Sequence, residues 1–159
     1  TTGSADDVIR IDNGELTGND TITDNGGDDS IVFRNSFGPS TNIAAVVNLN
    51  NVTGIENYDF LTNGNDGATD TASLTFQGGN VGTVTDININ GATVTDTDDS
   101  LTVLIDGVDN GGLANTVDVD YRFNITGTAG NDRLEKANAG LANQITFDGG
   151  AGAVIKSSF

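Results

Sequence analysis

The chain has 159 residues, of which 6 are Lys or Arg and 23 are Asp or Glu, so its formal net charge is −17; it has no His, Cys, Met or Trp. Without Cys and His, it has no disulfide, no zinc–thiolate site, no thiol nucleophile and no Ser-His-Asp triad. The charge disfavours binding to nucleic acid or anionic membranes and favours cations. No apolar run approaches the ~20 residues that span a bilayer, and we expect no enzyme.

The composition favours strands and turns. With 22 Gly, 20 Asp and only 3 Glu, the chain is rich in residues that disfavour helices. Ten short segments carry apolar residues at a period of two, which is typical of strands: 8–11, 30–33, 44–49, 57–61, 73–76, 84–89, 101–105, 117–121, 123–125 and 145–147. Clusters of Gly, Asn and Asp separate them and indicate turns. We therefore predict an all-β fold, a parallel β-roll or β-solenoid, with an antiparallel β-sandwich as the alternative.

One segment has apolar residues at helical spacing. In 131–141, Leu134, Ala137 and Leu141 would lie on one helix face, but Gly140 and several Asn residues in or beside the segment disfavour a helix. The chain also starts at Thr1 without an initiator Met and without a basic-then-apolar signal peptide. We therefore expect secretion by another route or a part of a larger protein.

The spacing of glycine and aspartate is the most informative feature. In the nonapeptide G-G-x-G-x-D-x-U-x, where U is a large aliphatic residue, the glycines turn tightly, the Asp carboxylate and nearby carbonyls bind calcium, and U fills the core of a parallel β-roll. Partial copies occupy 3–9, 18–22, 27–31 and 127–134, and Asp20 and Asp29 are one repeat length apart. The predicted metal-binding residues are Asp7, Gly18, Asp20, Gly27, Asp29, Gly130 and Asp132. A last copy at 147–155 lacks the Asp, so we expect no carboxylate-bound ion there.

These segments resemble the RTX, or haemolysin-type calcium-binding, repeats of bacterial proteins exported by type I secretion. The segment 51–60, which contains Gly54-Ile55-Glu56, is similar to a strand that follows such repeats in surface-layer proteins and giant adhesins. The stretch from 101–106 through 123–127 to 130–132 is similar to the segment that leads into the next repeat block. The resemblance touches both ends and one central strand and leaves 62–100 unassigned.

The resemblance implies a β-roll or β-solenoid, Ca²⁺ as the bound ion, and a secreted protein at the bacterial cell surface. It divides the chain into an RTX-like segment at 1–34, a strand-rich central segment at 35–126 and a degenerate RTX-like segment at 127–159, which we expect to form one continuous domain. Because a parallel stack with open ends exposes unpaired strand edges, we expect self-association into a surface-layer lattice or filament. A calcium-stabilised adhesin module that binds a surface glycan is the alternative.

Simpler structures fit parts of the same pattern. An isolated Gly-x-Asp cluster also fits a tight turn closed by an Asx cap. The acidic segments 65–70 and 96–100 lack the Gly and Glu of an EF-hand loop, so we expect solvated loops there. Thr-x-Thr triplets such as 83–85 and 93–95 suit exposed strand positions as well as a flat ice-binding surface. Paired carboxylates can serve a glycosidase, but no feature of the sequence points to an apolar cleft around them.

Overall fold

The computed structural model describes residues 2–12, 14–37, 44–47, 49, 51–62, 68–76, 86–105, 122–136 and 144–157. These residues form strands and contain no helix, so they offer no helical membrane span. The strands are β1 (Val8–Asp12), β2 (Ile22–Thr23), β3 (Ser30–Phe37), β4 (Ala44–Val47), β5 (Val52–Thr53), β6 (Asn57–Thr62), β7 (Thr71–Phe76), β8 (Asp86–Asn90), β9 (Ser100–Ile105), β10 (Arg122–Thr126), β11 (Asp132–Lys136), β12 (Gln144–Asp148) and β13 (Val154–Ser157).

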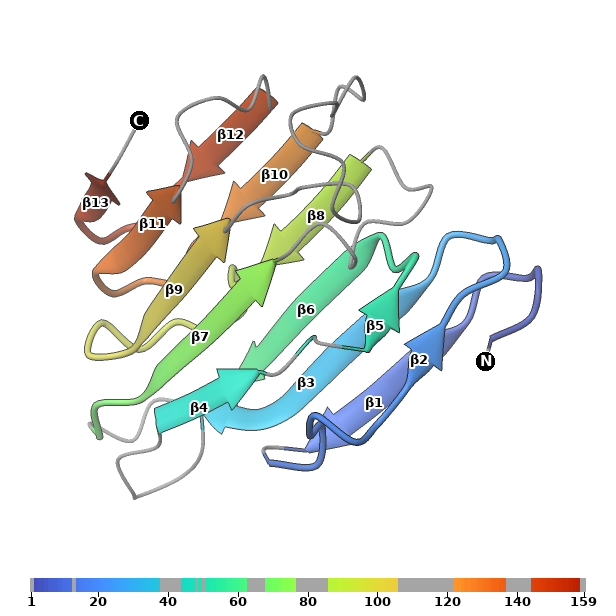
Figure 1. Cartoon of the computed structure of the whole chain (residues 1–159). Helices are drawn as coiled ribbons and strands as arrows, with labels where there is room; N and C mark the ends of the chain where they lie inside the picture. The colour runs from blue at the N-terminus through green and yellow to red at the C-terminus, as the bar shows by residue number, and fades with distance from the viewer. Residues whose placement is uncertain are drawn as a thin grey trace.

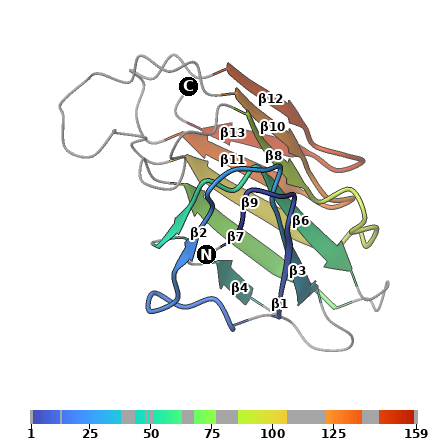
Figure 2. The same cartoon turned by 90° about the vertical axis from the view of Figure 1, so that its right-hand side faces the viewer.

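Every strand pair in the described residues is parallel. One sheet has the order β1-β3-β6-β8-β10-β12, a second has the order β13-β11-β9-β7-β4, and β2 pairs with β5. The chain alternates between the two large sheets, which face each other as layers (Figure 1), and the stack runs from β1 at one end to β12 and β13 at the other (Figure 2). The predicted parallel β-roll or solenoid is confirmed, and the antiparallel alternative is wrong.

Successive turns of the chain around the core, called rungs here, differ in length. Hydrogen bonds between neighbouring rungs join residues whose sequence separation is 22 for Asp7 and Asp29, 27 for Asp29 and Glu56, 31 for Asn57 and Asn88, and 36 for Asn88 and Asn124. At the far end of the stack the separation is again 22, between Asn131 and Ala153. The short rungs therefore lie at the two ends of the stack, and none has the length of the nonapeptide.

Apolar side chains from alternating strand positions fill the space between the sheets. One inward-facing column of the six-stranded sheet consists of Ile9, Ile31, Tyr58, Ile89, Ile125 and Phe147, each opposite the next. Leu74, Val103 and Leu134 form a facing column from the five-stranded sheet and are fully buried. Tyr58 and Phe76 meet edge to face across the core, with ring centroids 5.0 Å apart. The alternation that predicted strands is thus the alternation that builds the core.

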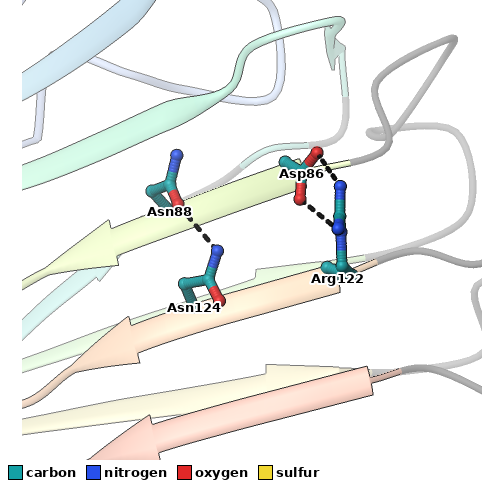
Figure 3. A network of polar contacts seen from close by, with 4 residues as sticks. All are labelled: Asp86, Asn88, Arg122 and Asn124. Carbon is teal, nitrogen blue, oxygen red and sulfur yellow. Dashed lines mark hydrogen bonds and ion pairs between the residues drawn. The ribbon is translucent and has the colours of Figure 1, made fainter.

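Polar ladders run along the outer face of the six-stranded sheet. The Asn88 side chain donates a hydrogen bond to Asn57 Oδ1 (2.9 Å). It accepts one from Asn124 Nδ2 (3.0 Å), as Figure 3 shows. Arg122 forms an ion pair with Asp86 on the preceding rung, at 2.6 Å (Figure 3). Arg34 forms one with Asp12, at 2.9 Å. In both ion pairs the Arg and the Asp occupy directly opposite positions of neighbouring strands.

Nine of the ten predicted segments overlap strands. The tenth, 117–121, lies outside the described residues, as do residue 48 of the segment 44–49 and residues 84–85 of the segment 84–89. Four strands were not predicted: β2, β5, β11 and β13. The helical spacing at 131–141 does not produce a helix at 132–136, which is β11. Strands from 1–34, 35–126 and 127–159 pair with one another within the two large sheets.

Candidate cation site

Acidic residues line the corner where the first three rungs enter the six-stranded sheet. Asp7, Asp29 and Glu56 immediately precede β1, β3 and β6, and the strand register places them one above another. The N–H of Asp7 donates to Asp29 Oδ1, and the N–H of Asp29 donates to Glu56 Oε2, both at 2.8 Å. Asp29 and Glu56 therefore each satisfy a backbone donor of the preceding rung, which fixes the spacing of the rungs at this corner.

The second oxygen of Asp29 distinguishes it from the rest of this column. Asp29 is fully buried, and its Oδ2 has no hydrogen-bond partner in the described part of the chain. Burial raises the pKa of Asp29; the hydrogen bond from the Asp7 N–H opposes the shift, and the neighbouring negative charge of Asp24 adds to it. Asp24 itself accepts hydrogen bonds from Thr2 Oγ1 (2.8 Å) and from the N–H of Gly26 (2.7 Å). A buried carboxylate oxygen beside a second carboxylate is thus left open to a proton or a cation.

Glu56 completes the acidic group around Asp29, and it gives the corner a predictable pH dependence. Burial raises the pKa of Glu56, and the charges of Asp24 and Asp29 add to the increase. The folded state therefore holds this proton more tightly than the unfolded chain does. Its contribution to stability is fully present below the ordinary pKa of 4.5 and is lost as the pH rises through the raised folded-state pKa.

We expect the Glu56→Gln variant to gain stability relative to the wild type as the pH rises from about 4 to about 7 in calcium-free buffer. Denaturant unfolding at several pH values measures the difference in free energy of unfolding between the two proteins. Glu15→Gln, in which an exposed glutamate loses the same charge, is the control. A difference for Glu56→Gln that stays flat or falls with pH would contradict this interpretation of the corner.

The corner that enters the five-stranded sheet has a different arrangement. The N–H of Asp70 donates to Asp99 Oδ1 at 2.9 Å. Asp132, one rung further, is fully buried and accepts hydrogen bonds from the N–H of Leu101, the N–H of Thr128 and the Thr128 hydroxyl, each at 2.8 Å. Burial raises the pKa of Asp132, while these donors oppose the shift. Both oxygens of Asp132 already have partners, so this carboxylate serves the backbone.

The structure separates the other predicted metal-binding residues from this acidic group or gives them other roles. Asp20 is exposed, and its Oδ2 accepts the N–H and the hydroxyl of Thr17 at 2.8 Å each, in an Asx-like turn that also contains Gly18. Asp7 Oδ2 accepts the N–H of Gly3 at 3.0 Å. Asp20 and Asp29 are one nonapeptide apart in sequence but do not lie one above the other.

The two predicted glycines near the strand corners serve close packing of the rungs. Gly27 has a φ of +131°, and a Cβ at this position would lie 2.6 Å from the carbonyl oxygen of Ala5 on the preceding rung. At Gly130 a Cβ would overlap the carbonyl oxygen of Asp99. In both places the backbone of one rung rests directly on the next, and only glycine leaves room for it.

Sequence reasoning missed Asp24 and Glu56. A usable signal was present for Glu56: Ala5-x-Asp7-x-Ile9, Gly27-x-Asp29-x-Ile31 and Gly54-x-Glu56-x-Tyr58 share one pattern of a small residue, an acid and an inward-facing core residue. The acids of these copies have sequence separations of 22 and 27, which hid the pattern from a search for nonapeptide repeats. Asp24 carries no comparable signal, because it follows the short strand β2.

Within the described ranges, no three acidic side chains are grouped closely enough to form a complete metal cage by themselves. A cation at Asp24 and Asp29 would therefore draw further oxygen ligands from backbone carbonyls or water, which calcium accepts. Comparisons with protein-family models, with curated proteins and with solved structures find no match for the chain.

Proposed function

We propose that the chain is a calcium-binding structural protein of the bacterial cell surface, whose β-solenoid is stabilised by the ion and assembles with its own copies. The supporting observation is Asp29, a fully buried carboxyl group with one oxygen bound to the Asp7 N–H and the other without a described partner. Such a group is costly to ionise unless a positive charge accompanies it. Calcium, held by Asp24 and Asp29 with Glu56 beside them, would supply that charge.

The overall charge supports the same proposal. A net charge of −17 on 159 residues opposes compaction through self-repulsion. An ion present at ~100 times its dissociation constant stabilises the folded state by ~2.7 kcal/mol, a large share of a typical stability of ~5–15 kcal/mol. A site with the weak affinity of extracellular calcium modules, ~10⁻⁴–10⁻³ M, would stay empty in the cytosol and fill outside the cell. Folding would then follow secretion.

Thermal unfolding followed by circular dichroism, in a chelator and then with increasing calcium, tests the ion. We expect calcium to raise the melting temperature of the wild type. Asp29→Asn should abolish most of this response, because the amide keeps an acceptor for the Asp7 N–H but removes the buried charge. Magnesium, which prefers a more rigid octahedral shell, should act more weakly.

Asp20→Asn is the matched control, because it removes the same charge one nonapeptide earlier from an exposed turn. It should keep the wild-type response to calcium. If calcium leaves the melting temperature of the wild type unchanged, the proposed calcium binding is wrong. An Asp29→Asn variant that responds fully would place the site elsewhere.

Sedimentation velocity at rising protein concentration tests the assembly separately. We expect the sedimentation coefficient of the calcium-loaded wild type to increase with concentration, because both large sheets end in strands that lack an outer neighbour among the described residues. A protein that folds with calcium and stays monomeric would instead favour the adhesin module, and saturable binding to a glycan array would then identify its ligand.

A further inference from the structure

The six-stranded sheet has a free edge at each end of the stack. β1 pairs only with β3, and β12 pairs only with β10, within the described residues. The N–H of Ser30 donates to the carbonyl of Asp7, so the backbone groups of Val8 and Arg10 point away from β3. Likewise the N–H of Gly127 donates to the carbonyl of Asp148, so the backbone N–H and C=O groups of Ile145 and Phe147 point away from β10. Each edge therefore presents donors and acceptors for one more parallel strand.

The apolar core is also open at these two edges. Ile31, Tyr58, Ile89 and Ile125 are at most 2% exposed, whereas Ile9 and Phe147, at the two ends of the same column, are only partly buried. On β13, the end strand of the five-stranded sheet, Val154 lies opposite the inward-facing Asp132 and is exposed as well. A further rung at either end would bury this surface.

The charges on the two edges complement each other, which indicates that one edge binds the other edge of a second copy. Arg34 and Arg122 each form an ion pair with an Asp directly opposite on the preceding rung of this sheet. Arg10, on the exposed face of β1, makes no ion pair with any described residue. Asp148, at the end of β12, is exposed, and its carboxylate accepts one hydrogen bond among the described residues, from the N–H of Gly150 (3.1 Å). Among the described residues, one edge therefore carries an Arg without an ion-pair partner, and the other carries an available carboxylate.

We propose that β1 of one copy pairs in parallel with β12 of another, with Ile9 opposite Phe147 and Arg10 opposite Asp148. This register extends the inward-facing column by one member and repeats the Asp–Arg arrangement of the interior rungs. It also matches the backbone directions, because the N–H of Arg10 meets the carbonyl of Phe147. A slip by one residue would point the apolar side chains outward.

The first rung of one copy and the last rung of the other, which meet at this junction, also match in length. The sequence separation between stacked residues is 22 at both ends of the stack, against 31 and 36 at its centre. Because the two edges are different surfaces, each copy leaves one edge free, and the contact propagates into a linear filament. This inference rests on the proposed self-assembly and specifies its junction.

Charge reversal tests the junction. Arg10→Asp and Asp148→Arg should each raise the protein concentration at half-assembly about tenfold, because a repulsive pair replaces an attractive one. Combining both substitutions in one chain should restore assembly. An equimolar mixture of the two single variants should also assemble, in alternation, because each edge then meets an opposite charge. Arg133→Asp, on the outer face of β11, is the control and should assemble as the wild type does.

Light scattering and sedimentation in saturating calcium measure assembly, and circular dichroism checks that each variant is folded, as expected for two exposed side chains. If the wild type assembles but neither the double variant nor the mixture recovers, the junction is wrong while self-assembly stands. If the single variants assemble as the wild type does, the junction is equally wrong. A folded wild type that remains monomeric at every concentration would overturn both self-assembly and this junction.

Discussion

Replacing Asp132 with Ala is expected to lower the free energy of unfolding by about 2–6 kcal/mol, because two buried backbone N–H groups lose their acceptor, and each loss costs ~1–3 kcal/mol. The donors are the N–H groups of Leu101 and Thr128, each 2.8 Å from the carboxylate. The Thr128 hydroxyl retains a second acceptor, the carbonyl oxygen of Asp99 at 3.0 Å, and is less affected. Denaturant unfolding followed by circular dichroism measures the loss.

Asp20→Ala is the matched comparison for this prediction. Asp20 also accepts the N–H and hydroxyl of a nearby threonine, Thr17, at the same distances, but in an exposed turn. Water can replace the lost carboxylate there, so the loss of stability should be much smaller. Equal decreases in the free energy of unfolding at the two positions would mean that burial does not determine how much these hydrogen bonds stabilise the fold. The proposed structural role of Asp132 would then be wrong.

The second large effect is expected at Gly130, where Ala should destabilise the fold by about 1–3 kcal/mol or more, as overpacking does in well-packed interiors. The added methyl group would overlap the carbonyl oxygen of Asp99 and lie 2.9 Å from that of Thr97. On the other side, Gly152 rests on the carbonyl of Gly130 in the same way. The rungs are therefore held on both sides and cannot separate without losing strand hydrogen bonds.

Gly3→Ala provides the control for this substitution. The nearest atoms to a Cβ at Gly3 lie at 3.9 Å and 4.0 Å, which is ordinary van der Waals contact. The melting temperature of Gly3→Ala should stay close to that of the wild type, while that of Gly130→Ala falls. If Gly130→Ala has the same melting temperature as the wild type, the close approach of the rungs at this corner does not constrain the sequence.

Sequence reasoning located β9 because its three inward positions are all apolar. In β9, Leu101, Val103 and Ile105 alternate with half-buried residues, and the alternation is visible in the sequence. In β11 the inward positions are Asp132, Leu134 and Lys136, so the same geometry has a polar sequence. That strand exists because its register with β9 buries Leu134 and lets Asp132 bind the neighbouring backbone. Local patterning cannot reveal such a partner.

The candidate site was predictable only in part for a related reason. The Gly/Ala-x-Asp spacing predicted metal-binding residues beside tight turns, and the structure places Asp7, Asp29 and Asp132 at rung corners. Which corners lie above one another depends on the rung lengths, which vary because the connections outside the motif vary. Asp24 lies beside Asp29 only because of that long-range stacking, so no local sequence spacing predicts the pair.

The unequal rung lengths have a consequence for how such a chain can change over time. Lengthening a rung from the shortest to the longest seen here adds only ~0.4 kcal/mol of loop entropy, because the cost grows with the logarithm of length. Insertions between strands are therefore nearly free, provided that the strands and the small residues at the corners are kept. A lineage carrying this fold can lengthen, shorten or exchange the outward segments of one rung without disturbing its neighbours, so new surfaces can arise on a scaffold that stays the same.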